Sequence, residues 1–118
     1  MTYKIKLSFD AAHFLPNYDG KCKRMHGHTW RATFFVAAPG KRDESGIGTD
    51  FKLLRKALEE VLPDHELLND HLGRPSAECL ARWLLGRAVI RLGKSVLGME
   101  LWESDGCGVE VWTGEVEK

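Results

Sequence analysis

The sequence has no excess of charge of either sign, because 17 Lys and Arg residues stand against 17 Asp and Glu residues. Without a net field, the chain has no general attraction to nucleic acid or to an anionic lipid surface. It also lacks a long apolar run, since no stretch approaches the roughly 18 residues that mark a membrane-spanning helix. We therefore expect no nucleic-acid partner and no membrane partner.

Cysteine is scarce, with only Cys22, Cys79 and Cys107 present. The first residues, MTYKIKLSFDAAHF, alternate polar and apolar types and lack the charged-then-apolar pattern of a signal peptide. An odd number of cysteines without an export signal argues against a disulfide framework. The sequence predicts free thiols in a cytoplasmic protein.

The composition is that of a folded domain, with 43% hydrophobic and 29% charged residues in a chain of 118. This length supports one hydrophobic core and leaves no room for a second. Repeats and low-complexity segments are absent from the sequence. We expect residues 1–118 to form a single domain.

Two strands are predicted near the N-terminus by alternating apolar positions. Residues 3–13 form a period-two pattern that ends on His13, and residues 28–38 form another that begins on His28. The segment between them contains turn-forming residues such as Pro16 and Gly20, which predicts a long hairpin loop.

The rest of the chain predicts two helices followed by two strands. The helices are expected at 50–62 and 76–92, and the strands at 95–104 and 108–114, joined by a turn at Asp105-Gly106. The order β-β-α-α-β-β predicts an α+β fold with a four-stranded antiparallel sheet and both helices on one face. The open edges of such a sheet favour a homo-oligomer.

The segment CKRMHGH at 22–28 concentrates metal-binding side chains. His26 and His28 are two apart and point the same way in a strand. If the first two strands pair with residue numbers that sum to about 41, His13 lies opposite His28 and Phe9 opposite Ala32. Three imidazoles with a free fourth position are typical of catalytic zinc. Two alternatives remain: a chance pair of histidines on a solvated loop, and a structural zinc site with Cys22 as fourth ligand.

Cys22 is the one cysteine with an activating neighbourhood in the sequence. Lys21, Lys23 and Arg24 flank it, and nearby cations stabilise a thiolate. The thiol is therefore a candidate base or nucleophile.

Carboxylates and histidines supply further candidates. The adjacent pairs Asp64-His65 and Asp70-His71 are either proton-transfer couples or solvated loop residues. Glu103 stands just before the predicted turn, where a carboxylate either faces a pocket or is an ordinary surface residue.

Taken in order, FDAAHF, CKRMHGH, DF after a polar turn, DHELLND, PSAE and WES resemble the 6-pyruvoyl-tetrahydropterin synthase family. The resemblance runs from about Ser8 to Glu115. The short bacterial members, the 6-carboxytetrahydropterin synthases of the queuosine pathway, look most similar. GIGTDF and PSAE depart from the more common family pattern. The presence of Cys22 disfavours a subgroup that carries glutamate there and makes a folate precursor.

The resemblance implies a tunnelling fold, in which trimers close their sheets into a barrel and two trimers stack into a hexamer with active sites between subunits. It also implies roles for individual residues: zinc ligands (His13, His26, His28), general base (Cys22), proton relay (Asp64, His65) and pterin contact (Ser76). Glu103 would be both the pterin anchor and the catalytic carboxylate that completes the relay. Asp70 and His71 are left as loop residues.

The implied activity is that of a zinc-dependent lyase acting on 7,8-dihydroneopterin triphosphate. The expected products are 6-carboxy-5,6,7,8-tetrahydropterin, acetaldehyde and triphosphate, with Lys21, Lys23 and Arg24 available to pair with the triphosphate. The same residues also suit a 6-pyruvoyl-tetrahydropterin synthase, which eliminates triphosphate without cleaving the side chain. A non-catalytic structural zinc module is the third reading.

Overall fold

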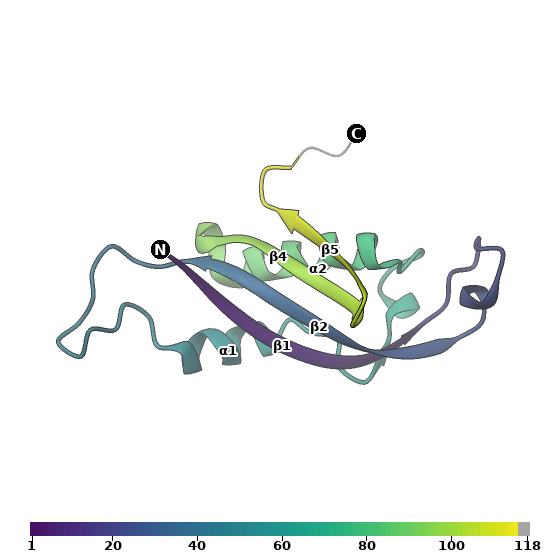
Figure 1. Cartoon of the computed structure of the whole chain (residues 1–118), viewed down its shortest axis with the longest axis horizontal. Coiled ribbons are helices and arrows are strands. Elements are labelled where there is room, and N and C mark those ends of the chain that lie inside the picture. The colour runs from purple at the N-terminus through teal and green to yellow at the C-terminus, as the bar shows by residue number, and fades with distance from the viewer. Residues whose placement is uncertain (116–118) are drawn as a thin grey trace.

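The computed structural model describes residues 1–115 as a curved sheet with two helices packed against it (Figure 1). The elements in chain order are β1 (Thr2–His13), β2 (His26–Ala37), α1 (Phe51–Glu59), β3 (Glu66–Leu67), α2 (Ala77–Leu92), β4 (Val96–Ser104) and β5 (Cys107–Trp112). The single domain predicted over 1–118 stays a prediction, and residues 116–118 lie outside the described part.

The β1–β2 ladder corrects the predicted register. Partners in the antiparallel pair sum to 39, so that His13 lies opposite His26 and Phe9 opposite Trp30. The predicted sum of 41, with His13 opposite His28, was therefore wrong by two residues. The observed register stacks Phe9 on Trp30, with ring centroids 6.3 Å apart, and starts β2 at His26. Because side chains repeat every two residues, this shift leaves every side chain on its predicted face.

The sheet has five strands in the order β3-β1-β2-β4-β5, not the four predicted. The additional strand, β3, spans only two residues and runs parallel to β1 beside Ala11 and Ala12. The sheet is therefore mixed and not purely antiparallel. A two-residue strand has no detectable periodicity, which is why the sequence pattern did not predict it. It fixes the segment after α1 against the end of β1.

Both helices begin at side-chain caps. The Asp50 carboxylate accepts a hydrogen bond from Lys52 N at 2.9 Å, and the Ser76 hydroxyl accepts one from Cys79 N at 3.2 Å. Such caps satisfy backbone N–H groups that have no partner within the helix. α1 ends at Glu59, three residues earlier than predicted, whereas α2 closely follows the predicted range.

One face of the sheet carries the core, and both helices pack on that face, as predicted. The buried residues come from β1 (Ile5, Leu7, Phe9, Ala11), β2 (Trp30, Ala32, Phe34, Val36), α1 (Leu54, Leu58) and α2 (Leu80, Leu84, Ala88). On the other face, Phe35 stacks on Trp112 with centroids 5.0 Å apart. Among the described residues, no helix combines the length and apolar content needed to cross a bilayer.

Candidate metal centre and proton relay

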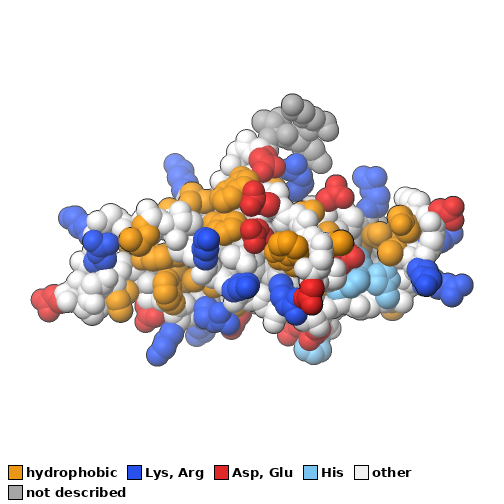
Figure 2. All heavy atoms as spheres, in the orientation of Figure 1, with side chains coloured by type: hydrophobic (Ala, Val, Ile, Leu, Met, Phe, Trp, Pro, Cys, Tyr) orange, Lys and Arg blue, Asp and Glu red, His pale blue; other side chains and the backbone are white. Residues whose placement is uncertain are grey.

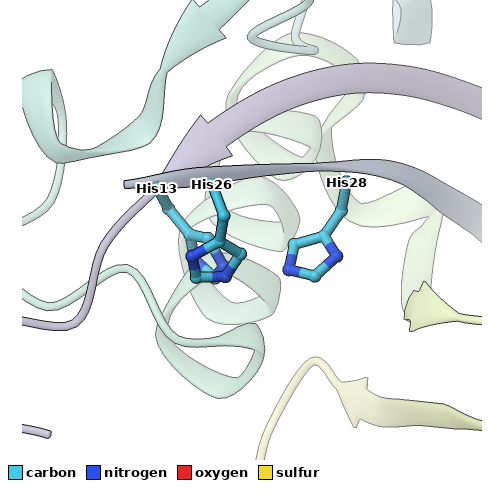
Figure 3. A group of neighbouring side chains, drawn as sticks. All are labelled: His13, His26 and His28. Carbon is cyan, nitrogen blue, oxygen red and sulfur yellow. The ribbon is translucent and has the colours of Figure 1, made fainter. Parts of the chain in front are cut away.

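The end of the β1–β2 hairpin brings three imidazoles together. His13 closes β1, while His26 and His28 open β2, and strand alternation places all three on one side of the ladder (Figure 3). The ring centroids are 4.6 Å apart for His13–His26, 5.1 Å for His13–His28 and 4.9 Å for His26–His28. Each ring offers one nitrogen, and these nitrogens lie within 4.8 Å of one another.

Backbone carbonyls orient two of the rings. His13 Nδ1 lies 2.7 Å from the oxygen of Pro75, and His26 Nδ1 lies 2.7 Å from the oxygen of Arg24. A carbonyl can only accept, so each Nδ1 carries the proton and donates it. The Nε2 atom of each ring is then left with a free lone pair. In metal sites, a hydrogen bond of this kind from the ring nitrogen that does not bind the ion commonly orients the histidine.

The burial of these nitrogens supports a bound cation. His13 is only 1% exposed, and the Nε2 atoms of His13 and His28 are buried without a hydrogen-bond partner in the part of the chain described. An unpaired buried polar atom costs about 1–3 kcal/mol, which coordination would offset. Three neutral imidazoles fit the ligand set of a zinc ion that keeps a fourth position open.

Burial favours the neutral form of the His28 imidazole. Burial is the largest influence on His28 and lowers its pKa below 6.5; the nearby Glu103 carboxylate raises this pKa, and His13 and His26 lower it. The Glu103 Oε1 atom lies 3.7 Å from His28 Nε2. Metals bind the deprotonated ring, so burial prepares His28 for coordination. Glu103 stands at the rim of the cluster.

Two residues beside the cluster were missed by sequence reasoning. Trp30 is fully buried under the histidines, with its ring centroid 5.2 Å from that of His13 and 5.3 Å from that of His28. Its signal was available, because it follows His28 by two residues on the same face. Pro75 acts through its carbonyl, and a backbone oxygen leaves no signal in the sequence.

Cys22 lies near the same end of the molecule but outside the histidine group. It occupies a 3₁₀ turn at Lys21–Lys23 and is a partly buried free thiol. Among the described residues, its sulfur is not one of the donor atoms that lie within 4.8 Å of one another. This arrangement does not support Cys22 as a fourth metal ligand. Figure 2 shows cationic side chains and histidines gathered at this end.

Asp64 and His65 form a separate group with Asp10. His65 Nδ1 lies 3.0 Å from Asp64 Oδ2, and Asp64 Oδ1 accepts a hydrogen bond from Asp10 N at 2.9 Å. The Asp10 N–H bond is the main reason that the pKa of Asp64 is lowered, followed by the contact with His65. Residues 10 and 13 of β1 point to opposite faces. The carboxylate of Asp10 therefore faces away from His13, and Asp10, Asp64 and His65 form a group separate from the imidazole cluster, although His28 and His65 both line one hollow.

The remaining candidates have local partners. Ser76 caps α2, and its predicted pterin contact stays a prediction. His71 Nε2 lies 2.8 Å from Glu66 Oε1, and its ring packs against Trp83 at 4.9 Å. His71 thus pairs with Glu66, whereas its sequence neighbour Asp70 closes a 3₁₀ turn.

The chain is similar in sequence to a known protein family and to named members of it. The family model described as 6-pyruvoyl tetrahydropterin synthase matches residues 2–114. The Synechocystis sp. protein named 6-carboxy-5,6,7,8-tetrahydropterin synthase is 38% identical over 90 residues, which cover 70% of each chain. The Bacillus subtilis protein of the same name is 40% identical over 74 residues, which cover 58% of this chain and 49% of that protein.

Solved structures share the fold. The Caenorhabditis elegans 6-pyruvoyl tetrahydropterin synthase superposes with a TM-score of 0.82 at 20% identity, covering 97% of this chain and 96% of that one. The Plasmodium vivax 6-pyruvoyl tetrahydropterin synthase gives 0.66 at 19% identity, covering 94% and 97%. At these identities the likeness concerns the fold alone.

Proposed function

The chain belongs to the 6-pyruvoyl tetrahydropterin synthase family, and from this premise we propose that it is a zinc-dependent carbon-carbon lyase. The proposed reaction converts 7,8-dihydroneopterin triphosphate and one water molecule to 6-carboxy-5,6,7,8-tetrahydropterin, with release of acetaldehyde and triphosphate. Its place would be the 7-deazapurine pathway that leads to queuosine. The names of the relatives at 38% and 40% identity support the carboxy product over the pyruvoyl product.

The observation that carries the proposal is the convergence of three imidazoles whose free nitrogens face one another. His13, His26 and His28 would hold the zinc ion through these nitrogens, two of them buried and otherwise unpaired. When bound, zinc supplies a Lewis acid that polarises the oxygens of the substrate side chain. Three protein ligands would leave room for the substrate beside the ion.

The remaining steps belong to side chains of the protein. Cys22 takes the carbon-bound proton as general base, and the cations at Lys21, Lys23 and Arg24 receive the triphosphate. The Glu103 carboxylate holds the amidine edge of the pterin ring. Asp64 orients His65, which returns a proton to the substrate.

The position of the relay supports an oligomeric enzyme. Asp64 and His65 group with Asp10, whose side chain faces away from that of His13, and they are separate from the imidazole cluster of their own chain. A complete site therefore joins the histidines of one copy with the relay of another. We propose trimers that close their sheets into a barrel, two of which stack as a hexamer.

A product assay tests the proposal directly. The zinc-loaded protein is incubated with 7,8-dihydroneopterin triphosphate, and the pterin is identified by mass spectrometry while acetaldehyde is measured separately. We expect 6-carboxytetrahydropterin and acetaldehyde from the wild type. Triphosphate release without acetaldehyde would indicate the pyruvoyl reaction instead.

Two cysteine variants separate the enzyme from a structural zinc module. Cys22→Ala should bind zinc as the wild type does and lose nearly all turnover, because the base is removed. Cys79→Ala, which changes an exposed thiol, is the matched control and should keep its activity. Full activity in Cys22→Ala would refute the assignment of the base.

A further inference from the structure

Two exposed polar residues, one on β1 and one on β2, lie next to the Asp64–His65 relay. Asp10 and Thr29 lie directly opposite each other in the ladder, and the Thr29 hydroxyl donates a hydrogen bond to Asp10 Oδ1 at 2.5 Å. We propose that Asp10 and Thr29 are positioning residues that hold the Asp64–His65 relay in its working orientation. The inference rests on the proposed function of that relay.

The backbone of Asp10 makes two hydrogen bonds to the relay. Its N–H donates to Asp64 Oδ1 at 2.9 Å, and its carbonyl accepts from His65 N at 2.6 Å. His65 has a φ of 59°, which places a non-glycine residue in the left-handed region. That conformation is uncommon and persists where its surroundings hold it. The two hydrogen bonds to Asp10 provide that restraint.

The carboxylate of Asp10 extends the support to the side chains. One of its oxygens, an oxygen of Asp64 and a ring nitrogen of His65 all lie within 4.8 Å of one another. The side chains of His65 and Asp64 are 77% and 53% exposed, so packing does little to hold them. Hydrogen bonds are therefore their main restraint. The Thr29 hydroxyl fixes the Asp10 carboxylate beside the imidazole.

The pair also borders the space that the relay faces. A hollow of about 570 Å³ is lined by Asp10, Thr29, His65 and Glu66, among others. Sites for small molecules have volumes of about 300–1,000 Å³. The hydrogen bond between Asp10 and Thr29 is not needed to hold the two strands together, because the β1–β2 ladder pairs twelve residues of each strand. Loss of one exposed side-chain bond should leave that ladder intact.

Thr29 variants test the proposal in the zinc-loaded oligomer with 7,8-dihydroneopterin triphosphate. Thr29→Val keeps the shape but removes the hydroxyl, and we expect kcat to fall about tenfold, with KM, zinc content and Tm unchanged. Thr29→Ser restores the donor and should stay within about twofold of the wild type. Thr33→Val, on the same strand and face but away from the relay, is the control.

Asp10 variants separate hydrogen bonding from charge. Asp10→Asn keeps an oxygen that can accept from Thr29, whereas Asp10→Ala removes it. A positioning role predicts a larger loss of kcat in Asp10→Ala than in Asp10→Asn. Equal losses in the two variants would show that the negative charge, and not the orientation set by Thr29, is what the relay needs, and would overturn the proposal.

A spectroscopic readout keeps the inference independent of turnover. The ring ¹⁵N signals of His65 and the amide signal of Asp10 should move in Thr29→Val and stay in place in Thr29→Ser and Thr33→Val. If the wild type does not turn the pterin over, the proposed function fails while this measurement still decides the positioning role. Unchanged His65 and Asp10 signals in Thr29→Val, or an equal loss of kcat in Thr29→Val and Thr29→Ser, would overturn the proposal.

Discussion

Replacement of His13 by leucine should separate the contribution of this residue to metal binding from its contribution to the fold. His13 is 1% exposed, and its Nε2 atom is buried without a partner. Leucine has a similar volume and no polar atom. The variant therefore removes one metal ligand and one unpaired polar atom in a single change.

The expected energies can be worked out from these contacts. In the metal-free protein, His13→Leu removes a buried nitrogen that has no partner, which relieves about 1–3 kcal/mol, and leaves the buried Pro75 carbonyl without its donor, at a similar cost. The two effects largely cancel, so the free energy of unfolding of the metal-free variant should lie within about 2 kcal/mol of the wild-type value. Zinc at 100 times its Kd should stabilise the wild type by about 2.7 kcal/mol. For a chain of this length that corresponds to roughly 11 °C in Tm.

The assay is thermal denaturation of both proteins in chelator and in excess zinc, with the metal content measured in parallel. We expect a large zinc-dependent rise in Tm for the wild type and a rise of less than about 3 °C for His13→Leu, because only two ligands remain. A full zinc-dependent shift in the variant would place the metal elsewhere. Strong destabilisation of the metal-free variant would show that His13 serves the core.

Three further outcomes are expected. Leu84→Ala, at a fully buried position of α2, should lower the free energy of unfolding by about 2–5 kcal/mol in urea denaturation, whereas Ile90→Ala on the exposed side should change it by less than about 0.5 kcal/mol. The folded pKa of His28 lies below 6.5, so as pH falls through 6.5 the unfolded chain takes up a proton that the folded one does not. Metal-free stability should therefore decline below pH 6.5, and less steeply in His28→Leu; a pH-independent wild type would contradict this. Gly98→Ala should destabilise the sheet by about 1–3 kcal/mol in the same urea assay, because its Cβ would overlap the Trp112 ring, while Gly73→Ala, in open space, is the control.

The faces of the strands and the stripes of the helices could be predicted from the sequence, because burial repeats with a local period. Ile5, Leu7 and Phe9 alternate with polar residues, so the pattern alone places them in the core. The register could not be fixed in the same way. A shift of two residues keeps every side chain on its face, so a sum of 39 and a sum of 41 satisfy the same pattern.

In the candidate site, the sequence indicates which side chains matter but not which backbone groups orient them. The histidines and Cys22 are visible as residue types at informative spacing. The carbonyl of Pro75 and the peptide group of Asp10 orient His13 and the relay through backbone atoms, which every residue possesses. The two residues of β3 are too few to carry a pattern, although they place His65 beside β1.

The bond between His13 and Pro75 has a consequence for the order in which the protein assembles. The two residues are 62 positions apart, whereas the β1–β2 hairpin closes within the first 37 residues. The hairpin can therefore form early, but the ring of His13 takes its final orientation only after the start of α2 has docked, because that contact closes a much longer loop. During synthesis, the ion would bind tightly only after α2 has emerged from the ribosome. Metal binding would therefore complete the fold and would not nucleate it.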